Sequence, residues 1–363
     1  MENRAHIHEA FTPPKKTMNI IDLHQDLWNS LRARRERLPH ALLFSGQRGI
    51  GKFELVRRFA ESLLCEQLTA TQEACGTCMA CGWLAQGNHP DLRLLQPAAM
   101  AAEEVTPATG EAASGTKKAS QQITIDQIRD LDEFLHVGTH RQGVRIVLVY
   151  PAEAMNRATA NAILKSLEEP IPGTVFLLVS SEPERLLPTI RSRCQAVPVP
   201  LPSATRAEAW LQQAGIKDAG HWLALAGGSP LLAAELGNKE ERALLDALSG
   251  FLVQGPNLDP LAAATALDRI VKADKRGAPL KRTVEWMQKW LHDLTRVKEG
   301  LPQRYFLSQS TALSRLAGAT STFNLLAFNK KTLQYRSQCE QPLNSRLFLE
   351  EFFISYAAVF ARS

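Results

Sequence analysis

The sequence lacks the features of a membrane or secreted protein. No stretch of its 363 residues approaches the roughly 20 consecutive apolar residues that a membrane helix needs. Residues 1–17 are polar and contain no apolar core of the kind that a signal peptide needs, so we expect a disordered extension there. The composition, with 45% hydrophobic and 22% charged residues, is ordinary for globular protein. We therefore expect a cytoplasmic protein with no membrane partner.

A large excess of either charge is also missing. The formal net charge of +5 is mildly basic and most simply describes a solvated surface. It permits a weak attraction to nucleic acid without indicating one. The length favours two or three domains, and we find no internal repeat.

Cysteine is scarce, but four of the six cysteines fall close together. Cys75, Cys78 and Cys81 form a C-x-x-C-x-x-C run, and Cys65 lies ten residues before it. In a cytoplasmic protein this clustering indicates a metal site rather than disulfides. Four thiolates at short spacings suit tetrahedral Zn²⁺ and leave no open coordination position, which predicts a structural zinc. An iron–sulfur cluster of the familiar pattern would require the run to continue with C-x-x-x-C-P, which is absent.

Apolar runs that alternate with helical patterns predict a parallel sheet covered by helices on both faces. The runs that read as buried strands are residues 40–45, 144–149 and 175–179. Helices are expected after the first strand and at residues 126–135 and 158–169. Residues 98–120 have no large apolar periodicity and are expected to form a flexible excursion.

After about residue 200 the strand patterns stop. Two helical blocks are expected, at residues 205–236 and from residue 240 to the end. Aromatic residues recur every four positions in the second block, which favours packing into a helix bundle over ligand binding. The residues concerned are Trp286, Trp290, Phe348, Phe352, Tyr356 and Phe360. The isolated Cys194 and Cys339 are likewise expected to be small core residues.

A glycine-rich segment joins the first strand to the helix that follows it. Residues 46–52, GQRGIGK, fit the phosphate-loop pattern G-x-x-x-x-G-K in the strand–loop–helix context that the mechanism requires. Gly46, Gly49 and Gly51 would let backbone N–H groups approach a phosphate, and Lys52 could reach the outer phosphates. The segment therefore predicts descent from a phosphate-loop ATPase.

Both groups with which such a protein holds Mg²⁺ are missing. Phe53 stands where the motif requires Ser or Thr, and Phe cannot ligate a metal. Tyr150 and Pro151 stand where an acidic pair is expected after a buried strand, and Glu153 could be an ordinary surface acid. Because phosphoryl transfer depends on charge neutralisation by Mg²⁺, we expect this chain not to hydrolyse ATP and to bind nucleotide weakly at most.

Several motifs occur together between residues 38 and 236. They are the strand and loop at residues 40–52, the four-cysteine insert, AILKSLEEP at 162–170, SRC at 192–194 and GSP at 228–230. With these motifs the sequence resembles the clamp-loader branch of the AAA+ ATPases, and within it the delta-prime family of bacterial DNA polymerase III. The helical tail matches this family only in character.

The resemblance implies an α/β fold in which an AAA+ P-loop parallel sheet with helices on both faces is followed by two helical domains. The AAA+ domain is expected at residues 18–200, with the zinc module at 65–81. A small helical lid domain is expected at residues 201–240. An all-α collar domain, which holds a pentameric ring together, is expected at residues 241–363.

The resemblance also implies a role for one arginine. In this family the arginine of the SRC motif reaches the ATP site of the neighbouring subunit, and here that residue is Arg193. A cation supplied in trans stabilises charge on the transferring phosphate. Without the resemblance, Arg193 would read as a member of a surface salt bridge. ATP-hydrolysing members also carry an arginine after Gly-Ser, where this chain has Pro230, Leu231 and Leu232.

The implied function is that of a non-hydrolysing subunit that helps to load the sliding clamp onto primed DNA. The implied partners are the gamma/tau and delta clamp-loader subunits, the sliding clamp and, through the complex, primed DNA. Two alternatives remain open. A gamma-type ATPase is disfavoured by Phe53 and Tyr150, and a zinc-bearing DNA-binding protein outside any ring leaves the phosphate loop and SRC unexplained.

Overall fold

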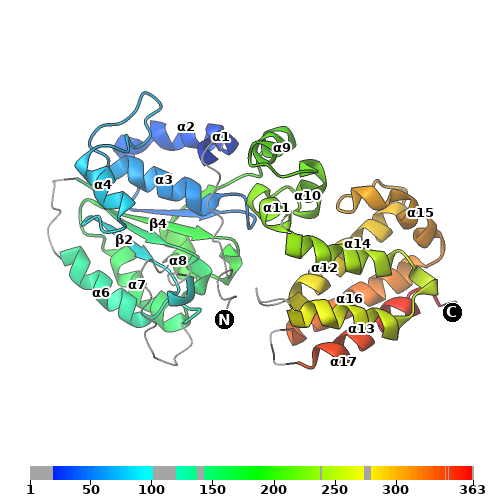
Figure 1. Ribbon diagram of the computed structural model, residues 1–363. Coiled ribbons are helices and arrows are strands. Elements are labelled where there is room, and N and C mark those ends of the chain that lie inside the picture. Colours follow the sequence, from blue (N-terminus) through cyan, green and yellow to red (C-terminus); the bar gives the residue numbers. More distant parts are fainter. Residues whose placement is uncertain are drawn as a thin grey trace, which may run out of the picture. The chain divides into compact units, whose positions relative to one another are not determined.

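The computed structural model describes residues 19–100, 120–136, 143–237, 239–273, 279–339, 341 and 343–361 (Figure 1). The expected extension at residues 1–17, and most of the expected excursion at 98–120, lie outside these residues. Contacts divide the chain into two compact units, Met1–Arg206 and Ala207–Ser363, and each is described by itself.

The first unit is built on a five-stranded sheet in the order β2-β3-β4-β1-β5, in which every pair of neighbours is parallel. The strands are β1 (Ala41–Ser45), β2 (Leu92–Leu95), β3 (Arg145–Val149), β4 (Thr174–Ser180) and β5 (Gln195–Pro198). The three predicted strands are the three central ones. The edge strands β2 and β5 were not predicted, because each has four residues and a single buried side chain, so neither forms a continuous apolar run.

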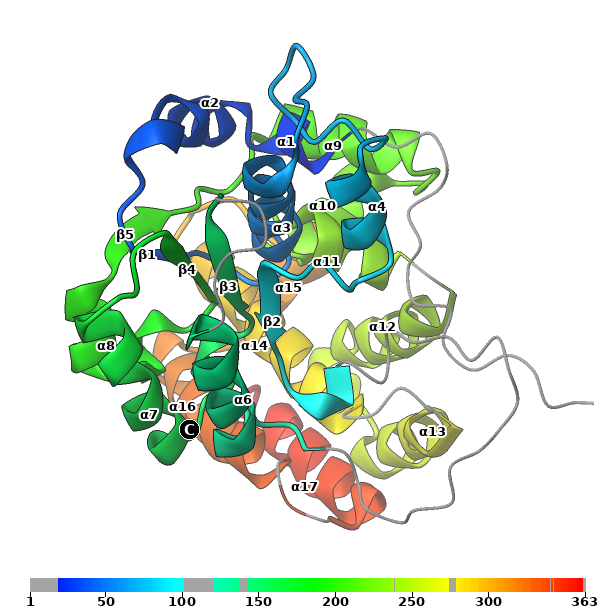
Figure 2. The ribbon, with the colours of Figure 1, turned by 90° about the vertical axis from the view of Figure 1, so that its left-hand side faces the viewer.

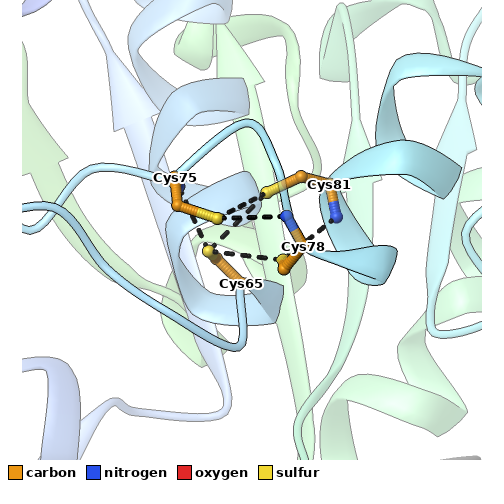
Figure 3. A group of neighbouring side chains, drawn as sticks. All are labelled: Cys65, Cys75, Cys78 and Cys81. Atoms are coloured by element: carbon orange, nitrogen blue, oxygen red, sulfur yellow. Dashed lines mark hydrogen bonds between the residues drawn. The ribbon is translucent and has the colours of Figure 1, made fainter.

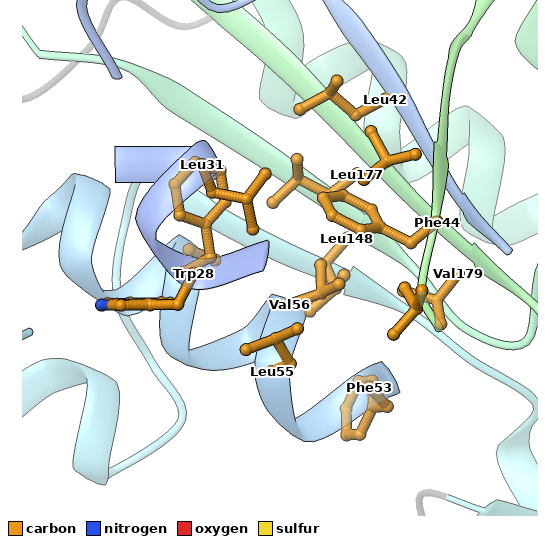
Figure 4. Close-up of a cluster of buried hydrophobic side chains, with 14 of the residues drawn as sticks. Trp28, Leu31, Leu42, Phe44, Phe53, Leu55, Val56, Leu148, Leu177 and Val179 are labelled. Carbon is orange, nitrogen blue, oxygen red and sulfur yellow. The ribbon is translucent and has the colours of Figure 1, made fainter. Parts of the chain in front are cut away.

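Helices cover both faces of this sheet (Figures 1 and 2). On one face lie α1 (Ile20–Leu23), α2 (Gln25–Ala33) and α3 (Lys52–Leu64), and on the other lie α6 (Ile125–His136), α7 (Arg157–Glu168) and α8 (Pro188–Arg193). Side chains along β1 alternate between the two cores: Leu42 and Phe44 pack with α2 and α3, as Figure 4 shows, and Leu43 packs on the opposite face. The α/β class, with a parallel sheet covered on both faces, is therefore confirmed.

The second unit is helical throughout its described residues. Its helices are α9 (Ala204–Gln213, which begins just before the boundary), α10 (Ala219–Leu225), α11 (Pro230–Leu236), α12 (Lys239–Leu252), α13 (Pro260–Ala273), α14 (Pro279–Lys298), α15 (Ser310–Gly318), α16 (Thr322–Gln338) and α17 (Ser345–Ala358). This confirms the expected all-helical C-terminal region. The division into a lid at 201–240 and a collar at 241–363 stays a prediction.

The aromatic side chains of this unit form its core, as their spacing predicts. Trp290 on α14 donates a hydrogen bond from Nε1 to the Tyr356 hydroxyl at 3.0 Å. The Tyr356 hydroxyl donates in turn to the Leu252 carbonyl at 2.7 Å. Phe360 lies beyond the end of α17 and is still buried. Because the Trp290 N–H and the Tyr356 hydroxyl both have hydrogen-bond acceptors, burial of these two rings leaves no unsatisfied donor.

In the part of the chain that the structure describes, we find no helix with both the length and the apolar character required to cross a membrane.

Candidate functional site

The phosphate loop leaves the end of β1 and enters α3, as its sequence context predicts. Gly49 and Gly51 have φ of 76° and 88°, a left-handed conformation that side chains disfavour. Gly46 is needed for a different reason, since a Cβ atom there would lie 2.6 Å from the Val199 carbonyl oxygen. The backbone of the loop thus requires glycine at each of these three positions.

The loop is occupied by the side chain of its own lysine. Lys52 Nζ donates to the carbonyl oxygens of Gly46 at 2.9 Å and Gln47 at 2.7 Å, and to Ser181 Oγ at 3.0 Å. Only 4% of Lys52 is exposed. Burial lowers the pKa of Lys52 to about 8, and the attraction of Glu153 opposes this shift. The ammonium group is therefore held by three oxygen atoms of the protein.

The two positions that lack magnesium ligands lie against each other. The rings of Phe53 and Tyr150 are stacked, with centroids 4.3 Å apart and planes 16° from parallel. Phe53 is 9% exposed and belongs to the core on the α3 face of the sheet (Figure 4). A phenyl ring stacked on a phenol supplies neither the Ser/Thr hydroxyl nor the carboxylate with which a phosphate loop holds Mg²⁺. The two substitutions thus form one packed contact.

Glu153 corrects the sequence-based expectation, because it is not an ordinary surface acid. It lies in the short 3₁₀ turn η2 (Ala152–Ala154), and its Oε1 accepts a hydrogen bond from the Ser181 backbone N–H at 3.0 Å. Its Oε2 is buried and has no hydrogen-bond partner among the described residues. The turn after β3 brings this carboxylate over the end of β4, toward Lys52. Sequence position alone did not reveal that approach.

His24 is a second contact to the loop that sequence reasoning missed. Its Nε2 lies 2.6 Å from the Ile50 carbonyl oxygen, so Nε2 carries the proton and donates it. The ring is almost fully buried, and this burial lowers the pKa of His24. A single histidine between two short helices carries no motif that could have identified this contact.

The four clustered cysteines converge, as predicted (Figure 3). Their Sγ atoms all lie within 4.8 Å of one another. Cys65 ends α3, Cys78 caps the N-terminus of α4 (Met79–Ala85), and Cys81 lies in the first turn of α4. The remaining cysteine, Cys75, belongs to the loop between these helices.

Backbone N–H groups donate hydrogen bonds to these sulfur atoms. Such donors matter for a metal site because they favour the thiolate form of cysteine. Cys75 N donates to Cys65 Sγ at 3.2 Å, Gly76 N to Cys81 Sγ at 3.3 Å and Cys78 N to Cys75 Sγ at 3.3 Å. Donors of this kind stabilise thiolates, the form in which cysteine ligates metal. Hydrogen bonds from Thr77 and Cys78 lower the pKa of Cys75 to about 6. Burial raises the pKa of Cys65 and of Cys81. The convergence of the four sulfur atoms, rather than their pKa values, shows that the cluster could hold a metal ion.

The other two cysteines differ from each other. Cys194 is buried in the sheet core, and burial raises its pKa to about 11, as suits a small core residue. Cys339 is only half-buried, so the expectation of a core residue was wrong there. It is the C-cap of α16 and not a residue of the helix interior.

The loop between Cys65 and Cys75 contacts the N-terminal helices. Leu68 and Ala74 form an antiparallel bridge, which makes a small hairpin. Asn19, the N-cap of α1, donates to Glu73 at 2.5 Å, and Arg32 on α2 donates to Gln72 at 3.3 Å. The two helices on either side of His24 therefore contact the segment that contains the cysteines.

Arg193 is the last residue of α8 and lies at the surface of the first unit. Its Nη1 donates to the Thr189 carbonyl oxygen at 2.9 Å, and its Nη2 lies 2.5 Å from Glu168 Oε1. The side chain is 33% exposed. It lines an open groove of about 590 Å³ together with His40, Leu167, Glu168 and Ser192. Its exposure leaves it accessible to another molecule.

Comparison with known proteins gives consistent matches over almost the whole chain. A family model described as DNA polymerase III, delta subunit, matches residues 23–202, and one described as DNA polymerase III, delta subunit, C terminal, matches residues 239–356. DNA polymerase III subunit delta' of Pseudomonas aeruginosa is 35% identical, over 94% of this chain and 98% of that protein.

Two further relatives agree with this match. DNA polymerase III subunit delta' of Yersinia pestis is 27% identical over 87% of this chain and 88% of its own length. DNA polymerase III subunit tau of Escherichia coli is 35% identical, but over 44% of this chain and 21% of its own length. The first of the three relatives, matched along almost its entire length, decides the assignment: this chain belongs to the DNA polymerase III delta-prime subunit family.

Proposed function

We propose that this chain is a non-hydrolysing clamp-loader subunit that contributes Arg193 to the ATP site of a neighbouring subunit. The observation that carries this proposal is the contrast between two sites of one domain. The chain's own phosphate loop is filled by Lys52 and bordered by the stacked rings of Phe53 and Tyr150. Arg193, in contrast, is partly exposed and lines an open groove.

The absence of hydrolysis follows from the chemistry of phosphoryl transfer. Magnesium must be held beside the phosphates by a hydroxyl and a carboxylate of the protein. The corresponding positions hold Phe53 and Tyr150, whose stacked rings supply neither of these two ligands. Nucleotide entry would also require Lys52 to leave three hydrogen-bond acceptors. The proposal therefore assigns this loop a structural role.

The trans role of Arg193 rests on its charge, exposure and position. A guanidinium is charged at all physiological pH values and carries five N–H donors in a planar fork that suits phosphate oxygens. Placed beside a transferring phosphate, it would stabilise the charge that develops in the transition state. A salt bridge to Glu168 does not prevent this role, because one N–H contact leaves other donors available.

The proposed partners are the gamma/tau and delta clamp-loader subunits, the sliding clamp and primed DNA. A subunit surface is supported by α16 and α17, where large apolar side chains are more than half exposed. These side chains are Phe323, Leu326 and Leu333 on α16 and Leu347 and Ile354 on α17. An ion pair joins the two helices side by side. Exposed apolar side chains that gather on neighbouring helices are a feature of interaction sites, and we call this set the apolar face.

The proposed metal is Zn²⁺, held by Cys65, Cys75, Cys78 and Cys81. When bound, a four-thiolate zinc supplies structural cross-linking and no catalysis, because no coordination position stays open. The amide donors around the sulfur atoms fit this assignment. The four side chains would fix the end of α3 to the start of α4 and set the hairpin between them.

Reconstituted clamp loader tests the proposal. Arg193→Ala should lower the ATPase rate of the complex in the presence of sliding clamp and primed DNA, while the chain still folds and assembles. Arg191→Ala is the matched control, because Arg191 lies in the same helix and is exposed. An unchanged rate with Arg193→Ala would contradict the proposal. Magnesium-dependent turnover by the isolated chain would instead favour a gamma-type ATPase.

A further inference from the structure

We infer that Glu168 is a positioning residue for Arg193, which orients the guanidinium toward the neighbouring ATP site. This inference rests on the proposed function of Arg193. It assigns a role to a side chain that the motif LEEP at residues 167–170 leaves unexplained. The geometry of the contact, the donors that remain on Arg193 and the position of the acid in its helix support this role.

The contact fixes the guanidinium at two points. Glu168 Oε1 lies 2.5 Å from Nη2, and the Thr189 carbonyl oxygen accepts from Nη1 at 2.9 Å. Glu168 ends α7 and Thr189 lies in α8, so the two anchors come from different helices. Two anchors on packed helices restrict the rotation of a side chain that otherwise has many rotamers.

The anchored arginine keeps donors for a second acceptor. A guanidinium has five N–H groups, and one contact on each terminal nitrogen leaves one N–H on Nη1, one on Nη2 and the one on Nε. Among the described residues, the remaining contact is a long one of 3.5 Å from Nη1 to Ser192 Oγ. The same arginine can therefore hold Glu168 and donate to phosphate oxygens at once. This geometry favours orientation over inhibition.

The placement of Glu168 is unfavourable for the helix that carries it. The C-terminal end of a helix has a partial negative charge, which a carboxylate in the last turn opposes. Glu168 is the last residue of α7, and a second acid, Glu169, follows it. Helix stability alone does not explain an acid at this position, whereas a partner cation in the groove does.

The test is the ATPase of the reconstituted complex with sliding clamp and primed DNA, measured against the concentration of ATP. Glu168→Ala should lower kcat about twofold to fivefold, the range of an ordinary exposed ion pair, with KM for ATP unchanged. Glu168→Gln, which keeps an acceptor oxygen, should recover part of the loss. Glu169→Ala, the matched control, should leave kcat unchanged.

The combination with Arg193→Ala separates this inference from the function on which it rests. In the Arg193→Ala background, Glu168→Ala should have no further effect, because the group that it orients is gone. Additive losses would overturn the inference, as would an unchanged kcat for Glu168→Ala beside a lowered kcat for Arg193→Ala. An unchanged kcat for Arg193→Ala would overturn the proposed function as well.

Discussion

The stacked pair Phe53 and Tyr150 gives a prediction that can be worked out from the structure. Phe53→Ala removes a ring that is 9% exposed and packed in the sheet core. Truncation of a buried Phe typically costs about 3–5 kcal/mol, and the partial exposure and helix-start position of Phe53 favour the lower end. The stacking geometry itself should contribute about 1 kcal/mol of this loss.

Urea unfolding measures both quantities. The transition of the sheet-containing unit is the relevant one, since a chain of two units need not unfold in a single step. Phe53→Ala should lower its free energy of unfolding by about 3 kcal/mol. A double-mutant cycle with Tyr150→Ala should give a coupling free energy of about 1 kcal/mol. Tyr150→Phe, which keeps the stacked ring, serves as the control.

Two results would refute this reasoning. A loss below about 0.5 kcal/mol for Phe53→Ala would place the ring outside the packed core. Additivity of the two alanine substitutions would show that the rings do not interact. Phe53→Thr gives the functional counterpart: it restores a hydroxyl but leaves Tyr150 in place, so it should create no magnesium-dependent ATPase activity.

Two further predictions concern the metal site and the apolar face. Elemental analysis should find one zinc per chain, which a chelator or Cys78→Ser should remove. Either change should also speed amide hydrogen exchange in residues 66–78 and in α1 and α2, because the hairpin contacts Asn19 and Arg32. Iron in the elemental analysis, or unchanged exchange in α1 and α2, would contradict this prediction. Leu333→Glu on α16 should weaken assembly with the other clamp-loader subunits, measured by size-exclusion chromatography. The circular dichroism of the isolated chain should not change, because Leu333 is 60% exposed and contributes little to the chain's own core. Gln334→Glu, the control, adds the same charge at the next position, and an equal loss of assembly with it would exclude a specific role for the apolar face.

The central fold was predictable because its signals are local. Three continuous apolar runs became β1, β3 and β4, and the glycine pattern of the loop places its turn correctly. The edge strands β2 and β5 and the short helices α1 and α2 escaped notice. Each of these elements is short and buries few side chains, so its apolar pattern cannot be distinguished from that of a loop.

The sequence predicted where the candidate residues lie along the fold but not their contacts. The cysteine spacing predicted the convergence of the four cysteines, and the loop motif placed Lys52 between β1 and α3. The contacts of Lys52 with its own loop, of Glu153 with Ser181 and of His24 with Ile50 depend on how distant segments pack. Spacing along the chain carries no information about such contacts, which is why the sequence could not distinguish Glu153 from a surface acid.

On the proposed function, the chain's own side chains close its phosphate loop, and its contribution to ATP chemistry lies at a neighbour's site. Isothermal titration of the isolated chain with MgATP measures whether the loop is closed. We predict no saturable binding at ATP concentrations up to about 1 mM, which means that any binding free energy is weaker than about −4 kcal/mol. A saturable, magnesium-dependent site that disappears in Lys52→Ala would contradict the claim, because it would show that Lys52 leaves its three acceptors to hold a phosphate.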